Sequence, residues 1–558
     1  MKKLVTIVLV LLMICSSCAF SALAEQGDAD RELYTLRIVV SPTERVKSDD
    51  SEIGAYIRDK FGIVIEYAPY SGNMQELESL QLASGDYGEV QHMEYSKIVQ
   101  EYTRAGVLID LDQYADQLGD FFRVFSDAIP YWRLAADGKL VRWDVSVPLK
   151  GETDIEVNDM AVRSDILEYY GWPTLVTEDD WVDFLKQAMI DFPETDGMPT
   201  LGLCVPFAES WGMTTMPTML YEKGENFVEL NNADSGVLFD MSKDEFVDEF
   251  LEPSVKDSFA FFNRLYREGI LDMESFTDTW PAVEEKMSNA SAISVFYTAW
   301  FGTANQTLVN AGKENMCYVK LPIMSNNQFA AGQKRAIRVE DTRAFNAWGI
   351  TDKCRYPERI VEFINWACTD EGQITLRSGI EGVHWTRDDE GKRVFTEVRL
   401  NAINDSDYLS RVIGANPVPF APSFNLLLGD GQYPDLMSHT ALADEYGLNA
   451  RQKEAYAAMG WKSSTEWWVD HGYFASTGLP GAIMLDSASE FADTAAKMLE
   501  FRVKTSASLI MAETEEDFER IYEAAVAEHL KMNPQSVVDE FNRLYQEQRA
   551  LFESANAD

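Results

Sequence analysis

The sequence predicts an α/β protein built as two lobes, and three observations support this prediction. The chain has 558 residues, more than one hydrophobic core usually serves. A strand at 36–40, a helix at 51–61 and a strand at 63–67 follow one another, and this alternation is typical of a parallel sheet flanked by helices. The alternation returns far downstream, where a strand at 347–350 precedes a helix at 357–368.

Each predicted element follows from its residue pattern. The apolar strand at 36–40 ends at a Ser-Pro break, and a helix at 74–83 ends at Ser-Gly-Asp. In the segment 177–189, Thr177 can cap a helix whose first turn is acidic and whose apolar residues fall on one face. Pro357 suits the first turn of the downstream helix. We interpret these apolar faces as core packing.

The first 24 residues resemble an export signal. Lys2 and Lys3 precede an apolar run at 4–14 of the length expected for such a signal. An Ala-Leu-Ala sequence predicts cleavage after Ala24, whereas Ser-Ser-Cys resembles a lipobox in which Cys18 would be lipid-modified. No later stretch approaches 18 consecutive apolar residues, so no transmembrane helix is expected. We expect a secreted, cell-surface or periplasmic protein.

Charge and cysteine content restrict the partners. Asp and Glu number 92 against 48 Lys and Arg, which gives a net charge of −44, so the chain should repel nucleic acid. Carboxylate-rich loops at 388–391 and 404–407 lack the full ligand order of an EF-hand, and turn solvation explains them better than Ca²⁺. We expect no metal and no cofactor. Disulfides and free thiols are both open for the four cysteines after the signal, which are Cys204, Cys317, Cys354 and Cys368.

The sequence contains none of the common strings of catalytic motifs. It has no G-x-S-x-G, H-E-x-x-H, Walker A or G-x-G-x-x-G string, and none of its five histidines is spaced as a helical metal pair. A secreted hydrolase acting on polysaccharide is the alternative to a binding protein, because a pair of carboxylates could form its site.

Several short blocks together resemble the extracellular solute-binding proteins of family 1. They are ASGD at 83–86, AGVLIDL at 105–111, DGK at 137–139, MAVRSDIL at 160–167 and YGWPT at 170–174. DEG at 370–372 and GIEGVHWT at 379–386 are similar to motifs of the large LplA-like lipoproteins in that family. Two positions depart from the family pattern, since Gly88-Glu89 replaces a usual Pro-Asp and Ser164-Asp165-Ile166 lacks a common Trp.

The resemblance implies a type II periplasmic-binding-protein fold, in which a hinge joins two lobes with a cleft between them. Lobe 1 would comprise 33–150 and 345–430, and lobe 2 would comprise 151–344 and 431–558. The implied function is the non-catalytic, monomeric binding component of an ABC importer, which delivers a small solute to a permease and its ATPase. The abundance of Trp and Tyr favours a sugar or oligosaccharide as that solute.

Aromatic and polar residues are the candidate ligand-binding residues, and those near predicted strand ends are favoured because ligands of parallel sheets bind beyond the carboxyl ends of strands. Tyr70 follows the second strand, and Glu94 and Tyr95 follow the third. The other candidates are Arg163, Trp211, Trp300, Trp348 and Trp385. A structural salt bridge would explain Arg163 equally well, and hinge packing would explain Trp348. His384, beside Trp385, is expected to be a hydrogen-bonded structural residue.

Overall fold

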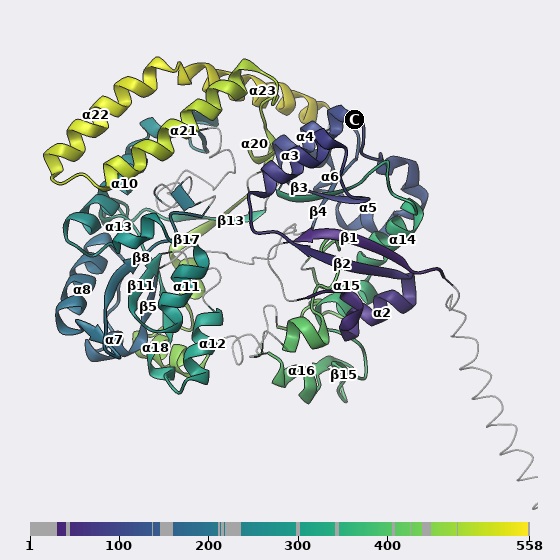
Figure 1. The fold of residues 1–558 in the computed structure, drawn as a ribbon, viewed down its shortest axis with the longest axis horizontal. Coiled ribbons are helices and arrows are strands. Elements are labelled where there is room, and N and C mark those ends of the chain that lie inside the picture. The colour runs from purple at the N-terminus through teal and green to yellow at the C-terminus, as the bar shows by residue number, and fades with distance from the viewer. Residues whose placement is uncertain are drawn as a thin grey trace, which may run out of the picture.

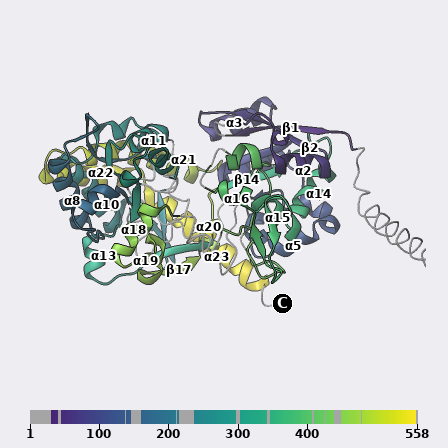
Figure 2. The same cartoon turned by 90° about the horizontal axis from the view of Figure 1, so that it is seen from below.

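The computed structural model of the chain forms two α/β lobes side by side, with a row of helices along one side of both (Figure 1). After a quarter turn the lobes still show as separate bodies that meet in the middle of the molecule (Figure 2). The structure describes residues 31–40, 45–134, 136, 138–145, 160–209, 212–213, 217, 236–296, 302–340, 345–403, 405, 408–424, 426–437, 448–476 and 478–555.

The first lobe is built on two groups of strands. β1 (Tyr34–Val40) and β2 (Ile63–Pro69) pair in parallel along their whole lengths. β3 (Val90–Tyr95), β14 (Phe345–Ile350) and β4 (Trp143–Asp144) form the order β3-β14-β4, and β14 runs antiparallel to both neighbours. β14 therefore comes from far downstream and completes a sheet whose other two strands, β3 and β4, are N-terminal.

Helices cover this sheet, and a small hairpin extends the lobe. The helices are α2 (Glu52–Phe61), α3 (Met74–Ser84), α4 (Ser96–Ala105), α5 (Gly119–Val124), α6 (Ile129–Leu134), α14 (Pro357–Ala367), α15 (Asp370–Arg377) and α16 (Glu397–Asn401). Shorter turns lie at Ser48–Asp50, Leu111–Gln117 and Tyr408–Ile413, and the hairpin pairs β15 (Trp385–Arg387) with β16 (Arg393–Phe395). The core includes Leu36, Ile65, Trp132, Trp143, Phe363 and Phe420.

The second lobe has a four-stranded sheet in the order β12-β5-β11-β8. β8 (Leu201–Cys204) and β11 (Ala292–Phe296) are parallel, whereas β5 (Met160–Arg163) is antiparallel to both β11 and β12 (Tyr318–Leu321). All five residues of β11 are buried, as expected for a strand covered on both faces.

Helices surround this second sheet as well. They are α7 (Ser164–Tyr169), α8 (Glu178–Asp191), α10 (Pro253–Arg267), α11 (Trp280–Ser288), α12 (Gly302–Asn310), α13 (Asn326–Ala330), α18 (Ala450–Met459) and α19 (Ser464–His471). Single turns lie at Glu249–Leu251, Met273–Phe276 and Glu314–Met316, and β6 (Glu194–Thr195) pairs with β7 (Met198–Pro199). The core includes Met160, Leu185, Leu203, Phe262 and Ile293.

Local sequence sets the ends of several helices. α2 begins after Ser51, whose Oγ accepts the N–H of Gly54 at 3.3 Å. It ends at Gly62, whose φ of 67° is a conformation that glycine adopts without a steric penalty. α8 begins with a capping box between Thr177 and Asp180, which confirms the predicted helix start. The predicted helix at 357–368 is confirmed as α14.

Each lobe therefore contains one strand that enters from a crossing between the lobes and runs antiparallel to its neighbours, β14 in the first lobe and β5 in the second. The two sheets covered by helices, each with one strand that arrives from the other lobe, confirm the predicted two-lobed type II fold. Two further strands, β13 (Arg335–Glu340) and β17 (Gly472–Ser476), pair in parallel between the lobes (Figure 1).

A C-terminal unit of helices is joined firmly to the second lobe. It comprises α20 (Gly478–Ala482), α21 (Glu490–Ile510), α22 (Glu515–Lys531) and α23 (Pro534–Ala555), packed against the hairpin of β9 (Val237–Asp240) and β10 (Glu245–Asp248). α21 also packs along α10, and buried Arg502 forms an ion pair with buried Glu249.

The same unit reaches the first lobe through a lighter contact. Near the end of α23, the ring of Phe552 stacks on Tyr131 of α6, with centroids 5.3 Å apart. Arg104 of α4 forms an ion pair with Asp486, and the Nε2 of Gln100 donates to the carbonyl of Leu485 at 2.9 Å. The row of helices in Figure 1 thus bridges both lobes.

Candidate functional site

The carboxyl edge of the first sheet brings three predicted ligand residues to one side of lobe 1. Tyr70 directly follows β2, and its N–H donates to the carbonyl of Val40, the last residue of β1, at 2.9 Å. Glu94 and Tyr95 are the last two residues of β3, which α3 connects to β2 by the kind of crossover that joins parallel strands. All three residues are partly exposed.

A buried carboxylate supports this edge from below. Glu78, in the middle of α3, is 1% exposed. One of its oxygens lies 2.6 Å from Nδ1 of His92, and the other accepts the N–H of Glu94 at 3.0 Å. The Nε2 of His92 lies 3.1 Å from Oδ1 of Asn346, which sits at the start of β14 with a φ of 52°. A side chain, and not a neighbouring strand, therefore accepts the backbone N–H of Glu94.

The sequence interpretation missed Glu78, His92 and Asn346. A signal for Glu78 was present, because it lies four residues from both Met74 and Leu82 on the inner face of the helix. An acidic residue at such a position is unusual unless it has a buried partner. His92 and Asn346 gave no signal, since their contact depends on strand pairing across a long separation in the chain.

Trp348 lies in the middle of β14 and is 4% exposed. It stands opposite both His92 and Trp143 in the sheet, and its ring makes an edge contact with His92 at 5.0 Å. It also contacts Phe420 within the core of lobe 1. Trp348 is thus a core residue directly behind the edge that carries Glu94.

Arg163 lies at the far edge of the second sheet. It ends β5, but because β5 runs antiparallel to β11 and β12 its carboxyl end lies where β11 begins. Its guanidinium donates to the carbonyl of Ala290 at 2.8 Å and to Oγ1 of Thr195 at 2.7 Å. It also forms an ion pair with Asp165 at 2.6 Å. These contacts match the structural salt bridge that was the alternative explanation of Arg163.

Trp385 is held within the hairpin of lobe 1. Its Nε1 donates to the carbonyl of Gly379 at 2.9 Å, and its ring packs among buried apolar residues that include Phe395. The neighbouring His384 is fully buried. Its Nε2 lies 2.6 Å from a carboxylate oxygen of Glu52, so the expected structural role of His384 is confirmed. Trp211, Trp300 and the proposed lipidation residue Cys18 lie outside the described residues.

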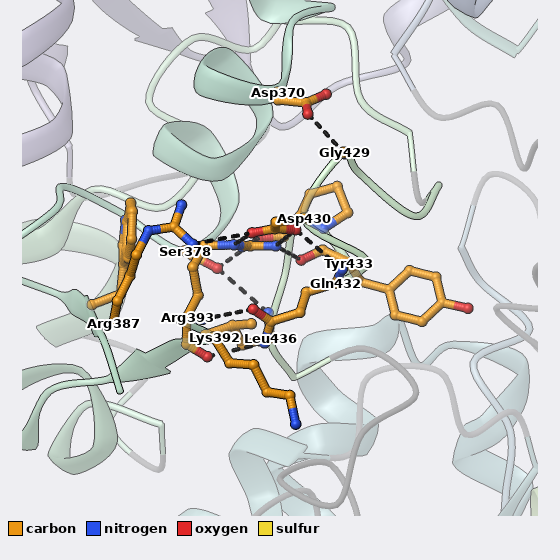
Figure 3. A network of polar contacts seen from close by, with 12 residues as sticks. Asp370, Ser378, Arg387, Lys392, Arg393, Gly429, Asp430, Gln432, Tyr433 and Leu436 are labelled. Atoms are coloured by element: carbon orange, nitrogen blue, oxygen red, sulfur yellow. Dashed lines mark hydrogen bonds and ion pairs between the residues drawn. The ribbon is translucent and has the colours of Figure 1, made fainter. Parts of the chain in front are cut away.

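A network of polar contacts anchors the last described stretch of lobe 1 before the chain passes to α18 (Figure 3). At its centre is the fully buried side chain of Arg393, which forms an ion pair with Asp430 at 2.6 Å. The same guanidinium donates to the carbonyl of Tyr433 at 2.8 Å, and the hydroxyl of Ser378 donates to the carbonyl of Pro434 at 2.6 Å. The ring of Tyr433 points away from these contacts (Figure 3).

An acidic cluster near the carboxyl end of β8 is neutralised by a lysine. The Nζ of Lys286 lies 2.7 Å from Asp272, 2.9 Å from Glu274 and 2.6 Å from Asp278. Burial acts to lower the pKa of Lys286, but the hydrogen bonds to the three carboxylates outweigh burial and raise that pKa above its usual value. Asp272, Glu274 and Asp278 are, among the described residues, the acidic side chains that lie close enough together to hold a metal ion. The ammonium group of Lys286 occupies the position between them that such an ion would take.

The four cysteines after the signal, for which the sequence left disulfides and free thiols open, are free thiols: Cys204, Cys317, Cys354 and Cys368. Burial raises the pKa of Cys317 to about 11, so this thiol stays protonated at neutral pH. In the loop at 388–391, Oδ1 of Asp388 accepts the backbone N–H groups of Glu390 and Lys392, each at 2.9 Å, and these hydrogen bonds close the turn.

Several solved binding proteins share this architecture. The alginate-binding protein AlgQ2 superposes with a TM-score of 0.63 at 15% identity, over 94% of this chain and 100% of that chain. An HMO-binding, ABC-transporter-associated solute-binding protein from Bifidobacterium longum infantis gives 0.61 at 13% identity, over 92% and 99%. The S. pneumoniae ABC-transporter substrate-binding protein FusA, in complex with kestose, gives 0.61 at 15%, over 93% and 100%.

These similarities define the class of fold, a two-lobed solute-binding-protein fold, and extend over nearly the whole chain. No protein-family model matches the chain, and no curated protein matches its sequence. Among the residues that the structure describes, no helix has the length and apolar character needed to cross a membrane.

Proposed function

We propose that the protein is the extracellular binding component of an ABC importer and that it captures a sugar or oligosaccharide between its lobes. The observation that carries the proposal is the two-lobed fold, with a strand exchanged between the lobes and with Tyr70, Glu94 and Tyr95 along one carboxyl edge. The similar proteins AlgQ2 and FusA bind alginate and kestose respectively. A carboxylate and two phenol rings at such an edge suit the hydroxyls and C–H faces of a sugar.

The finer parts of the proposal rest on the sequence. A relation to the LplA-like lipoproteins, a monomeric state, and delivery to a permease with its ATPase follow from the resemblance alone. We propose that the mature protein begins after Ala24, with lipid attachment at Cys18 as the alternative. Mass spectrometry of the natural N-terminus separates these two outcomes, because only the second adds the mass of acyl chains.

The experiment that tests the function is calorimetry of the mature protein against alginate, fructan and N-glycan oligosaccharides, run beside an assay for new reducing ends. We expect saturable binding of at least one oligosaccharide and no turnover. Tyr70→Ala and Tyr95→Ala should each weaken binding by tenfold or more without unfolding the protein, whereas Tyr169→Ala, on an exposed tyrosine of lobe 2, should not change it. Accumulating reducing ends would instead establish a hydrolase, and absence of binding across the panel would refute capture of these sugars.

A further inference from the structure

A small cavity lies between α3 and the strands β1 and β3. Its volume is about 170 Å³, below the roughly 300–1,000 Å³ of pockets that hold drug-sized ligands. One end is lined by Val39 near the end of β1 and by Met74 at the start of α3, and the other by Asp86 to Gly88 before β3. The cavity thus runs beneath α3 from the carboxyl edge, where Tyr70 lies, toward the opposite edge.

The position of this cavity is a topological switch point. From β1, the chain connects through α2 to β2 on one side and then through α3 to β3 on the other. In open α/β sheets, ligands bind outside the carboxyl ends of the strands at such a switch point, and the end of the cavity lined by Val39 and Met74 lies there. β1 and β3 form no ladder of paired residues among the described strands, so the gap remains open as a pocket.

The polar groups at the rim of the cavity retain unused hydrogen-bonding capacity. Both oxygens of Glu78 are engaged, by His92 and by the N–H of Glu94, and its side chain is only 1% exposed, so the polar groups open to a ligand lie at the rim. At the rim, the side chains of Arg37 and Asp86 are exposed and make no hydrogen bond or ion pair with any residue that the structure describes. The cavity therefore combines an exposed donor and an exposed acceptor at its rim with the apolar side chains of Val39 and Met74.

We propose that this switch-point pocket binds the terminal ring of a sugar chain, with Arg37 and Asp86 as residues that determine specificity. The inference rests on the proposed function and deepens it. The volume suits one ring and excludes a chain that continues in both directions. Asp86 accepts hydrogen bonds from ring hydroxyls, Arg37 donates to them, and Val39 and Met74 contact the C–H face. The protein would then recognise chain ends and not internal segments.

The test compares rim variants that leave the fold intact. Arg37→Ala and Asp86→Ala remove exposed side chains without described partners, so the melting temperature should stay unchanged. Each should raise the Kd for the oligosaccharide that the wild type binds by about tenfold or more, the effect expected when a charged hydrogen-bond partner is lost. Glu76→Ala is the matched control, because Glu76 is an exposed acid on α3 outside the cavity lining.

Saturation-transfer difference NMR on the same complex identifies the ring that contacts the protein most closely. We expect the strongest transfer to a terminal ring, and its loss when that ring is permethylated. If the wild type binds an oligosaccharide while both rim variants bind it like Glu76→Ala, the inference is overturned and the proposed function stands. If the wild type binds no sugar of the panel, the proposed function and the inference fail together.

Discussion

Replacing Lys286 with methionine should destabilise lobe 2 and make its stability depend on calcium. The ammonium group lies within 2.9 Å of three carboxylates, two of which, Asp272 and Asp278, have side chains only 7% and 9% exposed. Removing one partner of a buried ion pair costs roughly 3–5 kcal/mol, because the remaining charge stays buried. Glu274 is 71% exposed and adds little. We therefore expect a loss of about 3–5 kcal/mol in the free energy of unfolding.

Urea unfolding of wild type and Lys286→Met, with and without millimolar Ca²⁺, measures this effect. In the variant the three carboxylates face one another without a cation, so Ca²⁺ should raise its unfolding midpoint and leave that of the wild type unchanged. Lys392→Met is the control, because Lys392 is 62% exposed and its solvent-screened pairing with Glu390 should contribute little to stability. A loss below about 1 kcal/mol in Lys286→Met, or equal Ca²⁺ effects on both proteins, would show that the lysine does not neutralise this cluster.

Three further predictions concern contacts outside the proposed pocket. Burial acts to raise the pKa of Glu89, but hydrogen bonds from Arg355 and Tyr34 outweigh burial and leave that pKa below its usual value. The Glu89 carboxylate should therefore stabilise the fold above about pH 4.5. Its contribution should be lost as the pH falls through the lowered pKa. Glu89→Gln should therefore reduce stability at pH 7 and flatten its decline in acid, which urea titrations at pH 7 and pH 3.5 would detect; an unchanged decline contradicts the assignment. Phe552→Ala should cost about 0.5–1.5 kcal/mol of contact with Tyr131 and increase amide hydrogen exchange in the last turns of α23, and equal exchange in both proteins would mean that this stack does not hold the helix. Arg163→Met should lower the melting temperature yet leave sugar affinity within twofold of wild type, and a large loss of affinity measured by calorimetry would return Arg163 to the binding site.

Most of the fold could be predicted from the chain, and the site only in part. The pattern of apolar residues and helix ends is local, so β1, β2, α8 and α14 follow from short segments. Tyr70, which follows β2, and Glu94 and Tyr95, which end β3, lie at the carboxyl edge because the position of a strand end is also a local property.

Strand direction, by contrast, is set by partners far away in the sequence. Arg163 ends a strand, much as Tyr70 follows one, but β5 pairs antiparallel with β11, and this pairing places Arg163 at the edge where β11 begins. Trp348 was near a predicted strand end, yet its alignment with His92 and Trp143 sets it in the core. The positions of Arg163 and Trp348 are thus set by strand partners that lie more than ten residues away in the sequence.

The late arrival of β14 has a consequence for biosynthesis. The sheet of the N-terminal lobe lacks the strand between β3 and β4 until residue 350 has left the ribosome, roughly 10–40 s after β4 at ordinary rates of translation. A nascent chain whose leading half cannot close its core exposes apolar surface, and such surface is what chaperones bind.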